Sequence, residues 1–160
     1  MTFEIDAKRG VANHYGVRTT NQKFGGQVCD EVIKTAAWTF SYNDLPAGGT
    51  SKLHCVIPAN AKILDAYLEI ITGFTSTSTT TDLLVGLEQA DGTDIDLDGL
   101  LTAANATQTT IGAVGIITGS GALVGASIGA AAGEVIVTAS DVDLLTGKAR
   151  LVVQYLPVAP

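Results

Sequence analysis

The sequence has few of the residues that carry catalysis or hold metal ions. It contains two histidines and two cysteines, and neither cysteine lies in a CxxC pair or another metal-ligand spacing. His54 and Cys55 are adjacent, so on a strand their side chains would point to opposite faces and could not act as a catalytic pair. Cys29 and Cys55 are expected to be buried thiols, although a disulfide between them is also compatible with the sequence. These absences predict a protein that is not an enzyme and that uses no cofactor.

Charged residues are also scarce, at 16% of the chain against about 25% in a typical soluble domain. No lysine or arginine occurs between Ile63 and Gly147, and the net charge of −7 argues against a nucleic-acid-binding face. Much of the surface must therefore consist of threonine, serine, glycine and asparagine. A surface of this kind suits a protein that is partly covered by a partner.

The cations that do occur are concentrated near the N-terminus. Residues 1–30 carry a net charge of +1 and the remaining residues a net charge of −8, and the four N-terminal cations are Lys8, Arg9, Arg18 and Lys23. Glycine and asparagine interrupt any hydrophobic period here, which predicts an extended arm (residues 1–30) before one folded domain (residues 31–160). The N-terminus has no apolar run, so we expect no signal peptide and no export by that route.

Short segments rich in β-branched and aromatic residues follow one another along the domain. Turn-forming clusters of glycine, asparagine, aspartate and threonine separate them, a pattern typical of an all-β sandwich or barrel. A short helix is expected around residues 99–104. The predicted strands cover residues 32–42, 50–57, 64–70, 82–88, 134–139 and 148–156, and the predicted core residues are Trp38, Phe40, Leu64, Leu68, Val85, Val153 and Tyr155.

The stretch VIPANAKILDAYLEI, residues 56–70, fits either a turn followed by a strand or the first turns of a helix. With a period of two, Leu64, Ala66, Leu68 and Ile70 point to one face, whereas a period of 3.6 gives an equally good apolar stripe. The surroundings favour the strand, because extended segments flank the stretch and the run TSTSTTT that follows would continue a helix poorly.

The segment of residues 111–133 contains no charge, and glycines recur at every fourth position from Gly121 to Gly133. This spacing is typical of packed membrane helices, but seven of its residues are glycine and no Lys, Arg, Trp or Tyr flanks it as an interfacial anchor. We therefore expect a glycine-rich β segment or an extended loop, and no membrane partner. The same segment contains a G-x-S-x-G pattern around Ser127, yet both histidines precede it, so the hydrolase order of residues is missing.

Three alternating aspartates resemble the start of a calcium-binding loop. Asp94, Asp96 and Asp98 are followed by Gly99, but Asn105 occupies the twelfth position, where such a loop needs a bidentate glutamate. Ile95 and Leu97 are apolar where calcium loops are usually polar, so a strand edge with its aspartates in solvent explains the pattern equally. The sequence leaves a calcium site at these aspartates as an open alternative.

The order of turns and strands resembles the decoration, or cement, proteins of tailed-bacteriophage capsids. The resemblance is carried by Val56-Ile-Pro-Ala-Asn-Ala61 leading into Ile63–Glu69, by Leu83–Leu87, by Asp98-Gly-Leu-Leu101 and by the final strand Gly147–Tyr155. It covers about residues 32–156, in order, and it is a pattern of turns and strands rather than an invariant motif. The arm and the glycine-rich segment at residues 111–133 are less typical of this family.

The resemblance implies a jelly-roll-like β-sandwich with an extended N-terminal arm, bound to the outer surface of a phage head. Such proteins are made in the bacterial host cytoplasm, bridge neighbouring major capsid subunits and help the shell resist the internal DNA pressure. It implies the major capsid protein and further copies of the same chain, as a dimer or trimer, as partners. It carries no catalytic residues over to this sequence. We expect the arm cations Lys8, Arg9, Arg18 and Lys23 to contact acidic patches of the capsid.

Two other classes of function remain compatible with the sequence. One is a receptor- or glycan-binding head domain of a phage fibre or capsid surface, since jelly rolls often carry lectin sites. The supply of aromatic residues for such a site is small, with one tryptophan and four tyrosines. The other is a calcium-stabilised module of an unrelated surface assembly.

Overall fold

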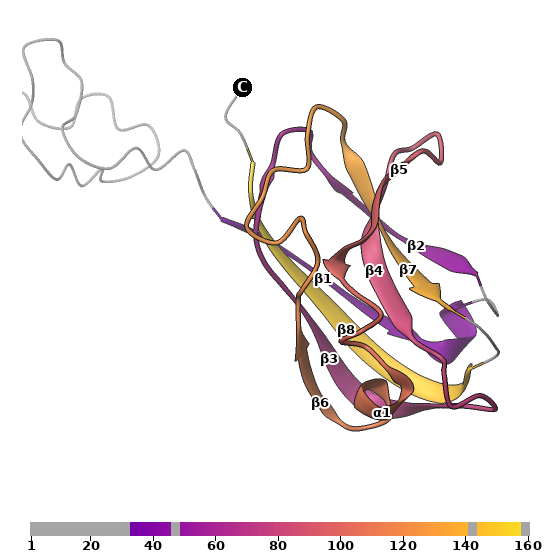
Figure 1. The fold of residues 1–160 in the computed structure, drawn as a ribbon. Coiled ribbons are helices and arrows are strands. Elements are labelled where there is room, and N and C mark those ends of the chain that lie inside the picture. Colours follow the sequence, from indigo (N-terminus) through magenta and orange to yellow (C-terminus); the bar gives the residue numbers. More distant parts are fainter. Residues whose placement is uncertain (1–32, 46–48, 141–143, 158–160) are drawn as a thin grey trace, which may run out of the picture. The chain divides into compact units, whose positions relative to one another are not determined.

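The computed structural model describes residues 33–45, 49–140 and 144–157, all of which belong to the compact unit Glu31–Pro160. The N-terminal arm lies outside the described residues. The described elements, shown in Figure 1, are β1 (Lys34–Ser41), the 3-10 helix η1 (Tyr42–Asp44), β2 (Thr50–Ile57), β3 (Lys62–Ser76), β4 (Leu83–Glu88), β5 (Asp94–Leu101), α1 (Gln108–Ile111), β6 (Gly115–Thr118), β7 (Gly133–Ala139) and β8 (Leu144–Leu156).

The strands form two antiparallel sheets of four strands each, with the orders β1-β8-β3-β6 and β2-β7-β4-β5. The ladder pairs β1 with β8, β2 with β7, β3 with β6, and β4 with β5. This pairing is that of one long hairpin, with β4 and β5 at its turn, whose two arms have been folded over together. Along each arm, successive strands alternate between the two sheets. Eight strands connected in this way form a jelly roll, which confirms the predicted all-β sandwich.

The ambiguous stretch is a turn followed by a strand, as predicted. Strand β2 ends at Ile57, Ala61 N donates a hydrogen bond to Pro58 O at 3.1 Å, and Asn60 adopts a φ of 60°. Asparagine tolerates this left-handed conformation better than most residues, which lets the chain reverse between the two sheets. In β3, Ala66, Leu68 and Ile70 are buried, as the period of two requires.

One predicted core residue of β3 is placed differently by a β-bulge. Ile63 pairs with Tyr155 and Asp65 with Gln154, so two residues of β3 oppose one residue step of β8. The extra residue reverses the alternation, and Ile63 is fully buried while Leu64 is half-buried. Of the other predicted core residues, Phe40, Leu68, Val85 and Val153 are buried and Trp38 and Tyr155 pack against the core.

The predicted helix at residues 99–104 is wrong. Strand β5 continues to Leu101, and α1 begins at Gln108. The reason is that a distant loop supplies the backbone hydrogen bonds that a helix would have supplied locally. Leu123 N donates to Gly99 O at 2.8 Å, and Ser120 N donates to Leu100 O at 3.1 Å.

The glycine-rich segment is an extended loop with one short strand, as predicted. Strand β6 occupies its first part, and the following loop runs beside the start of β3, where Ile63 N donates to Ala126 O and Gly125 N donates to Ile63 O, both at 2.9 Å. Gly125 and Gly129 adopt φ values of 84° and 91°, which glycine reaches without a steric cost. Within the described ranges, no helix is long and apolar enough to cross a membrane.

Candidate functional site

The arm cations Lys8, Arg9, Arg18 and Lys23 lie outside the described residues. Their expected contact with a capsid therefore stays a prediction. Cys29 also lies outside this part of the chain, so the pairing of the two cysteines is not tested.

Cys55 is half-buried on β2. Burial raises its pKa above the ordinary value for cysteine, and the charge of Glu134 raises it further. Since the thiolate is the reactive form, this environment disfavours nucleophilic chemistry. Cys55 therefore fits the predicted buried thiol better than a reactive group.

The serine of the G-x-S-x-G pattern serves the local turn. Ser127 Oγ donates a hydrogen bond to Asn60 O at 3.2 Å and accepts one from Gly129 N at 3.4 Å. These contacts tie the glycine-rich loop to the turn before β3, where Lys62 and Ser127 form an isolated bridge. The hydroxyl thus has a structural role in holding the loop.

The three aspartates of the calcium hypothesis lie along β5, an edge strand of the second sheet. Asp94 and Asp98 are exposed and Asp96 is half-buried, and Asp98 N donates to Asp96 Oδ1 at 3.3 Å. Burial raises the pKa of the Asp96 carboxyl, and the neighbouring Asp98 carboxylate also raises it. Ile95 packs against the core, whereas Leu97 is 43% exposed because the strand bulges between its pairs with Leu87 and Val85.

We expect calcium to leave the stability of this protein unchanged. In the part of the chain that the structure describes, no three His, Cys, Asp or Glu side chains lie close enough together to hold a metal ion. A ligand that binds only the folded state raises the Tm by an amount that grows with the logarithm of its concentration relative to its Kd, so the Tm measured with calcium and with a chelator tests this directly. A Tm that rises with calcium, and that no longer rises in an Asp96→Asn variant, would instead restore a calcium site at Asp94, Asp96 and Asp98.

The tertiary structure separates the charges of the domain between its two sheets. Lys34, Lys62, Lys148 and Arg150 lie on strands of the first sheet, together with two carboxylates, Asp65 and Glu69. The second sheet and its β4–β5 turn contain one cation and six carboxylates, namely Lys52, Glu88, Asp91, Asp94, Asp96, Asp98 and Glu134. The two faces of the sandwich therefore suit partners of different charge, a division that the order of residues along the chain does not show.

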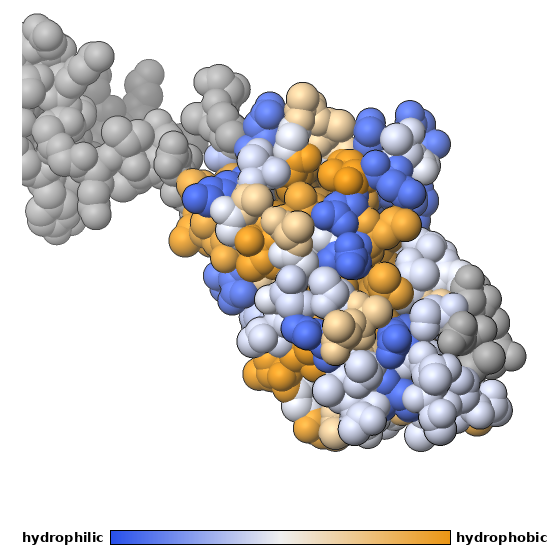
Figure 2. Space-filling model, in the orientation of Figure 1, coloured by the Kyte–Doolittle hydropathy of each residue, from blue (hydrophilic) through white to orange (hydrophobic). Residues whose placement is uncertain are grey.

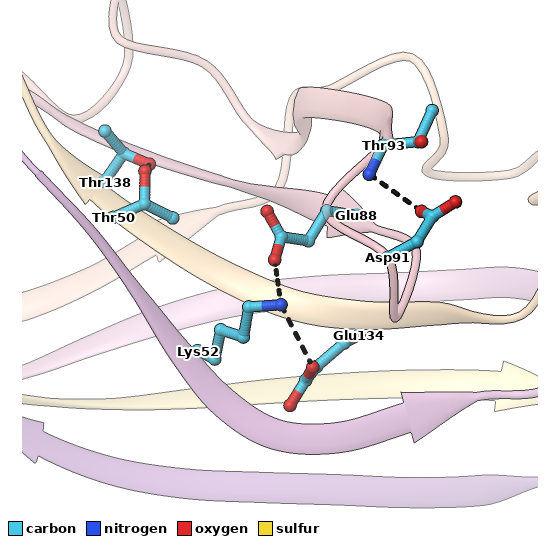
Figure 3. Close-up of polar contacts among 7 residues, drawn as sticks. All are labelled: Thr50, Lys52, Glu88, Asp91, Thr93, Glu134 and Thr138. Carbon is cyan, nitrogen blue, oxygen red and sulfur yellow. Dashed lines mark hydrogen bonds and ion pairs between the residues drawn. The ribbon is translucent and has the colours of Figure 1, made fainter.

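Lys52 is the counter-ion of two glutamates on the second sheet (Figure 3). Glu88 on β4 and Glu134 on β7 are directly opposed in the ladder, where like charges destabilise a sheet. The Lys52 ammonium reaches across from β2 to form an ion pair with Glu88 Oε1, and it lies 3.7 Å from Glu134 Oε2. The side chains of Glu88 and Glu134 are 11% and 16% exposed, so both carboxylates depend on this cation more than surface groups would. Sequence inspection missed this cluster.

We expect Lys52→Met to lower the Tm at pH 7. The substitution leaves two directly opposed carboxylates without their shared cation, so the ladder pair of Glu88 and Glu134 becomes an uncompensated pair of like charges. In the native protein the hydrogen bond to Glu88 raises the pKa of Lys52. The stabilisation is therefore present at neutral pH and is lost only as the pH rises above the ordinary lysine range, about 10.4.

The control for this substitution is Lys62→Met. Lys62 is exposed and forms no ion pair with any of the described residues, so its removal should change the Tm little at any pH. Thermal unfolding followed by circular dichroism at pH 7 measures both variants. Equal Tm values for Lys52→Met and Lys62→Met at pH 7 would show that the cluster contributes nothing to stability.

The outer face of the first sheet carries an open hollow of about 360 Å³. Its lining combines an aromatic side chain, an aliphatic side chain, a hydroxyl and charges of both signs, from Tyr67, Ile116, Thr118, Asp65, Glu69 and Arg150. Beside it, Ile116 and Val114 are 66% and 74% exposed, at and just before the edge strand β6. Figure 2 shows mostly pale colours, of intermediate hydropathy, where Figure 1 places α1 and the β3–β4 turn. This face is the described surface best suited to contact another protein.

Three solved structures contain chains with a similar fold. A chain of the cyanophage Pam1 capsid asymmetric unit matches with a TM-score of 0.61 and 17% identity, over 83% of this chain and 90% of that chain. A chain of the capsid of Ralstonia phage GP4 matches with a TM-score of 0.58 and 18% identity, over 84% and 90%. This protein shares its fold with chains of phage capsids. A chain of the acid-stable capsid of Helicobacter pylori bacteriophage KHP30 also matches, with a TM-score of 0.54 and 19% identity, over 78% and 87%.

No family model matches the sequence, and no curated protein matches it. The likeness to the capsid chains is therefore one of fold. The alignments cover 78–84% of this chain and 87–90% of the matched chains, so each matched chain is similar to this protein in length and consists mostly of this fold.

Proposed function

We propose that this protein is a non-enzymatic structural component of a phage virion. It binds the outer surface of the head and links neighbouring major capsid subunits, which strengthens the shell against the pressure of the packaged DNA. The observation that carries the proposal is the fold, a complete eight-stranded jelly roll shared with chains of similar length in three phage capsid structures.

The surface of the domain supports a role in assembly. A cement protein must cover and be covered by other proteins, and a low-charge surface loses little hydration energy when it is buried. Here charged residues are only 16% of the chain, and the first sheet presents an exposed apolar edge beside its hollow. Two described side chains of nucleophilic type also fit a structural protein. Burial raises the pKa of the Cys55 thiol, and the Ser127 hydroxyl donates a hydrogen bond to Asn60 O in a turn.

We further propose that the arm, residues 1–30, supplies the main contact with the major capsid protein. Four of the nine lysines and arginines of the chain, Lys8, Arg9, Arg18 and Lys23, belong to this segment, while the rest of the chain is acidic. A segment of this length spans up to about 100 Å when extended, which is enough to cross a neighbouring subunit. Charge complementarity with acidic capsid patches would then direct the arm onto the shell.

The experiment that tests the function uses phage heads lacking this protein. Cryo-EM reconstructions of such heads, with and without the purified protein added, should differ by extra density on the outer surface between capsid subunits. The density at each position would also give the stoichiometry and the number of copies in contact.

Heads that show no extra density would contradict the proposal. The protein would then be sought in the tail or fibre, where a receptor- or glycan-binding role could be tested by retention on a glycan array. In that case the likeness to capsid chains would describe the fold alone.

A further inference from the structure

On the outer face of the first sheet, residues of β8 and β3 that are opposed in the ladder form rows across the two strands. In each row the side chain on β8 is chemically complementary to the side chain on β3. The ladder aligns Arg150 of β8 with Glu69 of β3, and Val152 of β8 with Tyr67 of β3. A third row aligns Gln154 of β8 with Asp65 of β3. In the first row a cation on β8 lies beside an anion on β3. In the second a valine lies beside a tyrosine, and in the third an amide lies beside a carboxylate.

We propose that this face binds the same face of a second copy of the chain, about a two-fold axis that runs parallel to the strands between β8 and β3. This rotation leaves the position of each residue along the strand direction unchanged, and it places β3 of the second copy opposite β8 of the first. It therefore places Arg150 opposite the second copy's Glu69 and Gln154 opposite its Asp65. An isologous contact requires a surface complementary to itself, and this face meets that requirement in two rows, one on each side of the row that contains Val152.

The charges favour a second copy over other occupants. Arg150 is exposed and Glu69 half-buried, and neither forms an ion pair in the described part of the monomer. A uniformly acidic or basic partner would satisfy one of the two and repel the other, whereas a second copy satisfies both, twice in each dimer. Between these two rows Val152 is 2% exposed and so is already covered within the monomer, which leaves the flanking charged and amide groups to make the contact.

The same rotation covers the exposed apolar edge. It brings β6 of one copy over β1 of the other, because these are the outer strands of the sheet order β1-β8-β3-β6. Ile116 lies in the row of Glu69 and Arg150 and would meet the second copy's Thr39, which pairs with Arg150 at the opposite edge. Two sheets stacked in this way lie about 10 Å apart, at the usual spacing for packed sheets. Exposed apolar side chains on an edge strand would thereby be removed from water.

This inference goes beyond the proposed function, and it is tested in solution without phage heads. The full chain should sediment as a dimer that dissociates on dilution between about 100 and 1 μM, the range expected for a modest interface. Arg150→Glu opposes two carboxylates across the axis, and Glu69→Arg opposes two guanidinium groups. Each single variant should weaken its own dimer at least about tenfold.

The decisive sample is an equimolar mixture of these two variants. In the mixed dimer both charged contacts are again between opposite signs, so its affinity should return to about that of the native protein. Arg150 and Glu69 are also neighbours within one chain, so each substitution could weaken the dimer by disturbing its own chain. Mixing the two variants leaves each chain as it was, so a loss of that kind would not be restored in the mixture. Gln154→Glu, which opposes the second copy's Asp65 and leaves Arg150 and Glu69 unchanged, provides an independent weakening.

The control is Asp94→Arg, a charge reversal on the second sheet, which should leave the dimer unchanged. Circular dichroism and the Tm establish that every variant is folded. A native chain that stays monomeric at 100 μM, or that forms a trimer, would overturn the proposal. A mixture that fails to regain affinity, or an equal loss in Asp94→Arg, would overturn it as well.

Discussion

Gly86→Ala is expected to lower the free energy of unfolding by about 3 kcal/mol or more, and the Tm by about 10 °C. Gly86 lies in the middle of β4, and a methyl group there would overlap the carbonyl oxygen of Asp96 and the carbonyl group of Leu97. These are backbone atoms of the bulge in β5, which cannot rotate away as a side chain could. The strand must shift, and the shift disturbs Leu100 and Leu101, which are buried in the core.

Two other glycines provide the controls for this prediction. Gly115→Ala on β6 adds a methyl group in open space, so it should change the stability by less than about 0.5 kcal/mol. Gly125→Ala also meets no atoms, but its φ of 84° should cost about 1–2 kcal/mol. Chemical denaturation of the three variants separates steric overlap from backbone strain. A Gly86→Ala protein as stable as Gly115→Ala would show that β5 does not approach β4 as described.

Removal of residues 1–30 is expected to abolish binding to the phage head while leaving the Tm of the domain unchanged. The reason for the second part is that the described core cluster is formed entirely by residues from Phe40 to Val153. The reason for the first is the proposed role of the arm, which contains Lys8, Arg9, Arg18 and Lys23. Occupancy measured by co-sedimentation with heads, together with thermal unfolding of the truncated protein, tests both parts.

A full-length variant with these four cations changed to glutamine separates charge from length. If charge complementarity directs the arm, this variant should bind more weakly than the native protein, and the binding of the native protein should weaken with added salt. Truncated protein that occupies heads as fully as the native protein would refute the role of the arm. It would not affect the proposed dimer, since that interface lies on β8 and β3 and is measured without heads.

Most of the architecture could be predicted from the sequence because strand and turn signals are local. Alternation of apolar and polar residues sets which face of a strand is buried, and this is why Leu68, Val85 and Val153 were identified correctly. The turn at Pro58–Asn60 follows from the conformations that proline and asparagine prefer. The glycine-rich loop could be recognised by its lack of charge and of membrane anchors.

The errors arose where a distant segment decides the local structure. Leu64 and Ile63 exchange places because β8 pairs with β3 through a bulge, and no feature of β3 alone marks the position of that bulge. Residues 99–101 stay extended because the loop containing Ser120 and Leu123 provides their hydrogen bonds. Such partners lie some twenty residues away in the sequence, beyond the range of periodicity and propensity.

The sequence by itself determined that this is an all-β domain with a basic segment before it, because composition and periodicity act locally. The tertiary structure alone decided where the charges lie. Four of the five cations of the described domain fall on one sheet, and Lys52 is placed between Glu88 and Glu134. The rows that join Arg150 to Glu69 exist because β8 and β3 are adjacent in space, although they are far apart in the chain. The physical reason is that long-range pairing of strands is set by the packing of the whole core, which no short segment encodes.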